Sequence, residues 1–147
     1  MPIIDHSSKL VVGHALGDAD NTELALEAWR SAKRTLKRYG LKTEGLIIHQ
    51  DQDGVYLGHD WLYELAVRDK VRVSYSEKGA KGNVHMESFN GRPKSENRLL
   101  FWEQNDLASL KKVAGQRIRY YNHVCRHSVL GNKSPIRYLK KKGKIPG

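Results

Sequence analysis

The chain has 147 residues, a formal net charge of +10 and an apolar fraction of 39%, which suits one globular domain with a core of its own. Cys125 is its single cysteine, so neither an intramolecular disulfide nor a cysteine-based zinc cage can form. No apolar run approaches the length that spans a bilayer, and the first residues lack the pattern of a secretory signal. We therefore expect a cytoplasmic protein without a membrane segment.

The first half of the chain alternates strand and helix patterns. Apolar runs at 2–5 and 10–16 flank a short polar stretch and predict a β-hairpin. Thr22 is the expected N-cap of a helix whose apolar stripe belongs in the core and whose stop is Gly40. A short buried strand is expected at 45–49, followed by a turn at 51–54.

The second half continues the alternation and ends in helices. A second helix is expected to bury Leu62, Leu65 and Ala66, and residues 71–75 alternate like a strand. Two further helices are expected, at about 83–101 and 106–121. This order predicts an α/β layer fold with one mixed sheet flanked by helices.

Positive charge is concentrated at the C-terminal end of the sequence. Residues 107–147 contain eleven Lys and Arg and no Asp or Glu, whereas the rest of the chain has fifteen cations and sixteen anions. Such a segment is typical of a surface that neutralises nucleic-acid phosphates, and the tyrosines interleaved with the cations support this reading. The alternative is a solvated basic tail.

Asp51 and Glu87 form the candidate catalytic pair. Asp51 follows a predicted strand, and Glu87 lies in the first turn of a predicted helix, with thirty-five residues between them. That length is enough for the chain to return to the same edge of the sheet. With a third carboxylate, the pair could hold two Mg²⁺ ions for in-line phosphoryl transfer. Two unrelated surface acids are the alternative.

Several stretches in a fixed order resemble the catalytic core of insertion-sequence transposases of the retroviral-integrase superfamily. They are IIDHSSKLVVG at 3–13, LIIHQDQDGVY at 46–56, SYSEKG at 74–79, NVHMESF at 83–89 and YNHVCRHSVLG at 121–131. The resemblance implies a ribonuclease-H-like fold and an Asp-Asp-Glu site that binds two divalent ions, Mg²⁺ or Mn²⁺. Asp51 matches the second Asp of that site and Glu87 matches its Glu. Asp53 lies where the family has a small residue, so it is either a turn residue or a substitute ligand.

One departure from the family concerns the first catalytic Asp. In the family it lies on a strand that precedes the first strand expected here, whereas Asp5 resembles the Asp that ends the family's second strand. We therefore expect the first strand, the N-terminal DNA-binding helices and one metal ligand to be missing from this chain. Either a second polypeptide or a separate reading frame would then supply them, or the gene is a decayed remnant. Asp5 as a relocated ligand is the weaker alternative.

The expected organisation is a catalytic core at 1–105 and a C-terminal helix with a basic tail at 106–147. The resemblance implies metal-dependent DNA cleavage and strand transfer by a homo-oligomer. The alternative is a non-catalytic fragment that binds DNA or a partner, and activity of the chain alone is left open. The residues expected at DNA are Lys78, Lys81, Lys94, Arg98, Lys111, Lys112, Arg117 and Arg119.

Overall fold

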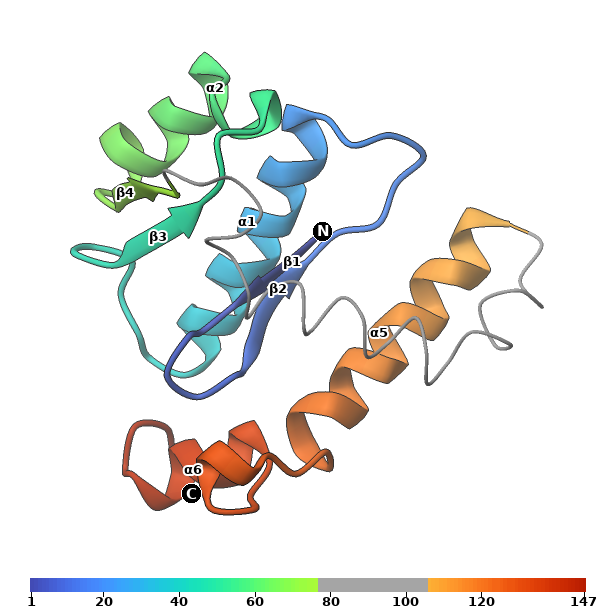
Figure 1. Cartoon of the computed structure of the whole chain (residues 1–147), viewed down its shortest axis with the longest axis vertical. Helices are drawn as coiled ribbons and strands as arrows, with labels where there is room; N and C mark the ends of the chain where they lie inside the picture. The colour runs from blue at the N-terminus through green and yellow to red at the C-terminus, as the bar shows by residue number, and fades with distance from the viewer. Residues whose placement is uncertain (77–105) are drawn as a thin grey trace.

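The computed structural model describes residues 1–76 and 106–147, and its first elements are a hairpin and a long helix (Figure 1). Strands β1 (Pro2–Ile4) and β2 (Val11–His14) pair antiparallel, as the sequence predicts. The turn between them is closed by the Asp5 N–H, which donates to Leu10 O at 2.8 Å. The hairpin packs on helix α1 (Thr22–Arg38), so this helix forms the base of the fold.

Helix α1 begins and ends close to where its sequence predicts. The N-cap is Asn21, whose Oδ1 accepts a hydrogen bond from the Leu24 N–H at 2.9 Å, so Thr22 is the first helical residue and not the cap. Past its last turn, Gly40 has a φ of +70°, a conformation that favours glycine. The buried side chains of α1 recur at helical spacing and are Leu24, Ala25, Leu26, Ala28, Trp29, Ala32 and Leu36.

The second pair of strands is parallel. Strand β3 (Ile47–Gln50) pairs in register with β4 (Arg72–Tyr75). A parallel pair needs a crossover connection, and a helical one follows β3 here. Its parts are the 3₁₀ turn η1 (Gly54–Tyr56), the short helix α2 (His59–Leu62) and the π-helix η2 (Tyr63–Arg68).

The π-helix changes which side chains of the crossover are buried. Its wider turn is closed by the Asp69 N–H, which donates to Glu64 O at 3.0 Å across five residues. Trp61 and Leu65 are buried, at 2% and 0% exposure. Ala66 is exposed, so its predicted burial was wrong, because the sequence was interpreted with the narrower period of an α-helix.

The C-terminal part of the chain is helical. It consists of α5 (Leu107–His123), the 3₁₀ turn η4 (Ser128–Leu130) and α6 (Pro135–Lys141). Asp106 and Ser134 are the N-caps of α5 and α6. Ile136 and Ile145 pack with Leu10, so the end of the chain covers the hairpin from one side.

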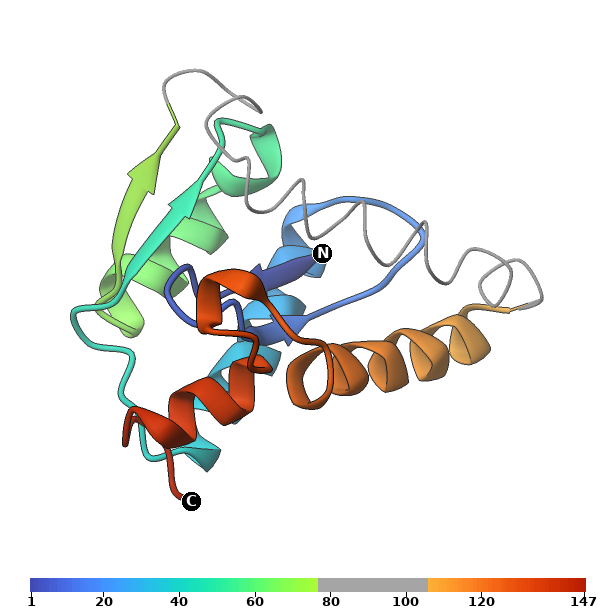
Figure 2. The ribbon, with the colours of Figure 1, turned by 60° about the horizontal axis from the view of Figure 1, so that its bottom comes forward.

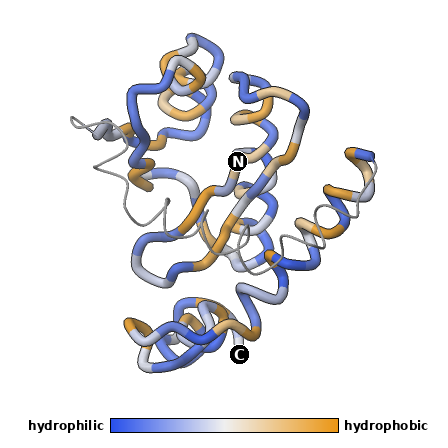
Figure 3. The backbone as a smooth tube through the Cα atoms, turned by 45° about the vertical axis from the view of Figure 1, so that its right-hand side comes forward, coloured by the Kyte–Doolittle hydropathy of each residue, from blue (hydrophilic) through white to orange (hydrophobic). Residues whose placement is uncertain are grey.

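The observed architecture is α/β, but the single mixed sheet that we expected is divided. Within residues 1–76 and 106–147 there are two sheets of two strands each, β1–β2 and β3–β4, which lie apart in Figure 2. Both rest on α1, because one core contains Trp29 of α1, Ile3 of the hairpin and Ile48 of β3. In Figure 3 the hairpin strands have hydrophobic colour and their connecting turn has hydrophilic colour, as expected for a pair with one face on a core.

Candidate functional site

Asp51 is the first residue after β3 and is half-buried. Its Oδ1 accepts a hydrogen bond from the Asp53 N–H at 3.1 Å. In the described part of the chain, Oδ2 has no hydrogen-bond partner. Asp51 therefore presents a free carboxylate oxygen at the carboxyl end of a parallel strand, which is where α/β sheets usually carry their ligands.

Gln50 fixes the backbone from which Asp51 projects. Its side chain is buried at 4% exposure. Gln50 Oε1 accepts from Trp61 Nε1–H at 2.8 Å, and Nε2 donates to Tyr56 O at 3.1 Å. Both polar groups are thus satisfied, as burial requires. Sequence reasoning missed this anchor, because glutamine is usually exposed and no local pattern indicates its burial.

Asp53 has a structural role in the same loop. Its Oδ1 accepts from the Val55 N–H at 3.0 Å and caps the 3₁₀ turn η1. This geometry agrees with the expectation that Asp53 is a turn residue. His49, just before the loop, has Nδ1 3.1 Å from Ser74 Oγ on the paired strand.

Negative charge gathers at this end of β3. The pKa of Tyr56 is raised to about 12, first by burial and then by the charges of Asp51, Asp53 and Asp20. Asp20 was not among the candidate residues, because it lies in the loop before α1, far from the others in sequence. Its charge makes this end of the fold more attractive to a cation.

Asp5 occupies a different place. It lies after β1, and its Oδ2 accepts from Ser7 Oγ at 2.9 Å, from the Ser8 N–H at 3.0 Å and from Ser8 Oγ. Burial acts to raise the pKa of Asp5, but the hydrogen bonds from Ser8 and Ser7 outweigh it and hold the pKa below its usual value. The Asp5 carboxylate therefore stabilises the hairpin turn by accepting hydrogen bonds from Ser7 and Ser8.

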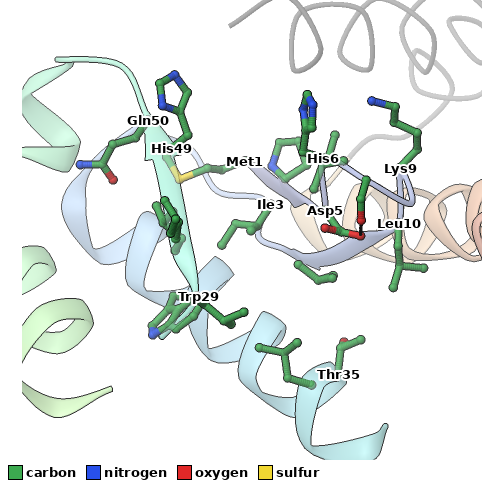
Figure 4. Close-up of a pocket in the computed structure, with 18 of the residues that line it drawn as sticks. Met1, Ile3, Asp5, His6, Lys9, Leu10, Trp29, Thr35, His49 and Gln50 are labelled. Carbon is green, nitrogen blue, oxygen red and sulfur yellow. Dashed lines mark hydrogen bonds between the residues drawn. The ribbon is translucent and has the colours of Figure 1, made fainter. Parts of the chain in front are cut away.

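The structure does not bring Asp5 to the end of β3 that carries Asp51. In Figure 4, Met1 lies next to His49, whereas Asp5 lies further along β1, close to Leu10. Within the described ranges, no group of three His, Cys, Asp or Glu side chains could hold a metal ion. Among the described residues, Asp5 and Asp51 therefore do not belong to one common group of possible metal ligands.

Five of the predicted site residues lie outside the described residues. They are Glu87, Lys78, Lys81, Lys94 and Arg98, all within 77–105. Their roles stay predictions.

The predicted basic surface is present on α5 and α6. Lys111, Lys112 and Arg119 are exposed, and Arg117 is half-buried with its guanidinium 5.9 Å from the centre of the Tyr120 ring. In the part of the chain that the structure describes, no cation of 107–147 forms a salt bridge; the bridges there involve Arg30, Lys33 and Arg68. The C-terminal charges are therefore available to an anionic partner.

A single amide orients α5 against the hairpin. Asn122 Oδ1 accepts from the Val11 N–H at 2.9 Å, and Asn122 Nδ2 donates to Val11 O at 3.0 Å. The side chain pairs with β2 as another strand would, and so satisfies the outer edge of the hairpin. Sequence reasoning missed Asn122, because the two residues are 111 positions apart.

Comparison with known proteins identifies the class. Residues 69–135 match the integrase core domain family. The chain is 32% identical over 133 residues to the insertion element IS600 uncharacterized 31 kDa protein of Shigella sonnei, an alignment that covers 89% of this chain and 47% of the relative. Together the two matches support an integrase-type core of the insertion-sequence transposase kind and a function related to transposition. No solved structure matches the chain.

Two further facts concern the length of the chain and its helices. The chain spans about half the length of the curated relative that it matches. None of the helices in 1–76 and 106–147 is long and apolar enough to cross a bilayer.

Proposed function

We propose that this chain is the core of a DNA transposase, which cuts and joins phosphodiesters with Asp51 and Glu87 as ligands of Mg²⁺ or Mn²⁺. The observation that carries the proposal is the position of Asp51, a half-buried carboxylate with one free oxygen at the end of β3. Carboxylate oxygens are the ligands that hard divalent cations prefer. The match to the integrase core domain covers residues 69–135, which include Glu87 but not Asp51, and it supports a role for Glu87 in an integrase-type core.

Different residues of the chain serve catalysis and DNA binding. When bound, the divalent ions would lower the pKa of the attacking group and stabilise charge on the phosphate and the leaving oxygen. Asp51 and Glu87 would hold these ions, and the buried Gln50 side chain fixes the backbone next to Asp51. The cations of α5 and α6, which form no salt bridge among the described residues, bind backbone phosphates and so hold the DNA without reading its sequence.

A second function is also supported by a specific observation. Asp5 is engaged in the hairpin turn and lies away from Asp51, and no group of three His, Cys, Asp or Glu side chains among the described residues could hold a metal ion. A chain with two ligands would bind DNA through its basic surface without cutting it. This non-catalytic DNA-binding role is the alternative to the transposase reaction.

The test is nicking of a duplex that carries the terminal repeat of the element, with Mg²⁺ or Mn²⁺ and the full chain. We expect Glu87→Gln and Asp51→Asn each to abolish nicking while DNA binding is retained. Asp60→Asn is the matched control, because Asp60 is exposed on α2 and has no part in the proposed site. DNA binding without metal-dependent nicking by the unmodified chain would favour the non-catalytic role.

A further inference from the structure

His49 projects from the outer face of the parallel pair β3–β4. Its side chain is exposed, whereas Ile48 before it packs against the core and Gln50 after it is buried. Side chains alternate along a strand, so His49 lies on the face that is turned away from the core. In Figure 4 its ring points away from Trp29 of α1. Among the described residues, the ring is therefore open to a molecule that approaches the sheet from outside.

Ser74 of β4 fixes the orientation of this ring. The two residues are partners in the strand register, and His49 Nδ1 lies 3.1 Å from Ser74 Oγ. A serine hydroxyl can donate a hydrogen bond to an imidazole nitrogen, and the ring then carries its proton on Nε2. Within residues 1–76 and 106–147, Nε2 has no hydrogen-bond partner. The ring is thus an oriented N–H donor whose hydrogen bond is available to a ligand.

His49 shares its face of the sheet with Asp51. The Ser76 N–H donates to Gln50 O at 2.9 Å, so the pairing with β4 continues to the last residue of β3. The alternation of side chains then places Asp51 with His49, on the side opposite to Gln50. Two residues of a strand span roughly 7 Å. This separation is close to the distance between consecutive phosphates of one DNA strand.

The same face carries a positive charge. Arg72 of β4 lies two residues before Ser74, so its side chain is on the face that carries His49. It is exposed, and it forms no salt bridge within the two described ranges. Neither β3 nor β4 contains Asp or Glu. A phosphate chain that passes Asp51 along this face would therefore meet a hydrogen-bond donor and then a cation, and no carboxylate of either strand.

We propose that His49 donates its Nε2–H to an oxygen of the DNA phosphate next to the one held at Asp51. This assignment rests on the proposed function, because Asp51 marks where the reacting phosphate lies. His49 is then a binding residue that sets the register of the DNA strand across the site. Ser74 is a positioning residue that acts through the ring. A hydrogen bond to a charged phosphate is stronger than one between neutral groups, so its loss should weaken binding about tenfold.

Neutral phosphate analogues test this contact with the full chain. The probe is a set of terminal-repeat duplexes, each with a methylphosphonate, in which a methyl group replaces one charged oxygen, at a different position near the end. Fluorescence anisotropy without divalent ions gives the affinity. We expect His49→Ala to bind the natural duplex about tenfold more weakly. At one position the methylphosphonate should weaken the unmodified chain about tenfold and His49→Ala no further, because both changes remove the same hydrogen bond. Equal losses for the two chains at every position would overturn the proposal.

Two further sets of variants separate contact from structure. His59→Ala is the matched control, because His59 is exposed on α2 and its ring lies beside that of Tyr63. We expect this variant to behave like the unmodified chain at every position. Ser74→Ala should lose about threefold, at the position found for His49, and Ser74→Thr, which keeps the hydroxyl, should restore binding. The same non-additivity for His59→Ala, or no recovery with Ser74→Thr, would contradict the proposal.

The binding measurement is independent of the proposed chemistry. Non-additive binding at His49 without metal-dependent nicking would refute the transposase reaction and leave the phosphate contact in place. Nicking with equal methylphosphonate losses for both chains would do the reverse. If the unmodified chain does not bind the natural duplex, the contact is refuted whatever the nicking result.

Discussion

At the scale of single residues, three predicted carboxylates have different environments although all lie in turns. Asp5 accepts hydrogen bonds from Ser7 and Ser8, and Asp53 caps a 3₁₀ turn. Asp51 accepts one backbone hydrogen bond and keeps an oxygen free in the described part of the chain. Asp5 thus has more local donors than Asp51, whereas Asp51 and Asp53 each accept one backbone hydrogen bond.

The pKa of Tyr56 depends on the charge of Asp51. Its pKa is raised from 10.0 to about 12 by burial first, and then by Asp51 and two other carboxylates. We expect Asp51→Asn to lower the pKa of Tyr56, because one negative charge that opposes the phenolate is removed. The measurement is the tyrosinate absorbance as a function of pH, with Tyr56→Phe to identify the signal. An unchanged pKa would mean that the Asp51 charge does not act on Tyr56.

The same pKa has a consequence for stability. Between about pH 10 and 12 the folded protein keeps a proton on Tyr56 that the unfolded chain loses. The free energy of unfolding therefore falls as the pH rises through this window. Tyr56→Phe removes this contribution, and the stability of that variant should fall less steeply in urea titrations over the same range.

At the scale of elements, the hairpin and α1 touch at a glycine. A Cβ at Gly13 would lie 2.5 Å from Ala28 O and 2.5 Å from Ala32 N. Both are backbone atoms of a helix, which cannot move aside as a flexible side chain would. The small residues of α1 and Gly13 of β2 thus set the distance between helix and sheet.

Two glycine-to-alanine variants test this contact. We expect Gly13→Ala to lower the free energy of unfolding by about 3 kcal/mol, because the hairpin must move away from α1. Gly115→Ala is the matched control: this glycine lies within α5, and a Cβ there has no atom within 4 Å. Alanine should stabilise that helix by roughly 0.5–1 kcal/mol. Urea denaturation measures both, and an equally small effect at the two sites would disprove the close contact.

At the scale of the whole molecule, charges of opposite sign are held by different parts of the fold. Glu64 and Asp69 near α2 form ion pairs with Lys33 at 2.8 and 3.1 Å. The C-terminal helices have no such partners among the described residues. The excess of positive charge therefore stays on α5 and α6, where it attracts phosphates over distances of about a Debye length.

Exposed cations on α5 should set the salt dependence of DNA binding. Lys112 and Arg119 are both exposed and lie two helical turns apart. We expect Lys112→Gln with Arg119→Gln to weaken binding for all duplex sequences and to reduce the slope of log affinity against log salt by about 2. Fluorescence anisotropy at several salt concentrations gives this slope.

The control for that variant carries the same loss of charge on another helix. Arg34→Gln with Arg38→Gln removes two exposed cations from α1. We expect its salt slope to match that of the unmodified chain. A similar loss for the two double variants would mean that net charge alone, and not the α5 surface, determines binding.

Much of the fold was predictable because it depends on neighbours in sequence. The hairpin follows from two apolar runs, and α1 follows from its stripe and from Gly40. The burial of Leu65 was predictable, whereas the exposure of Ala66 was not, because a π-turn changes the helical period at that point. For the site, the sequence identified Asp51 but not Gln50 or Asp20.

The sequence by itself determined the hairpin, helix α1, the concentration of positive charge and the position of Asp51 after a strand, because each depends on a few adjacent residues or on composition. Only the tertiary structure decided that Asn122 of α5 pairs with Val11 of the hairpin and that the described strands form two separate sheets. These outcomes depend on packing between segments up to 111 residues apart, and local patterns carry no information on such contacts.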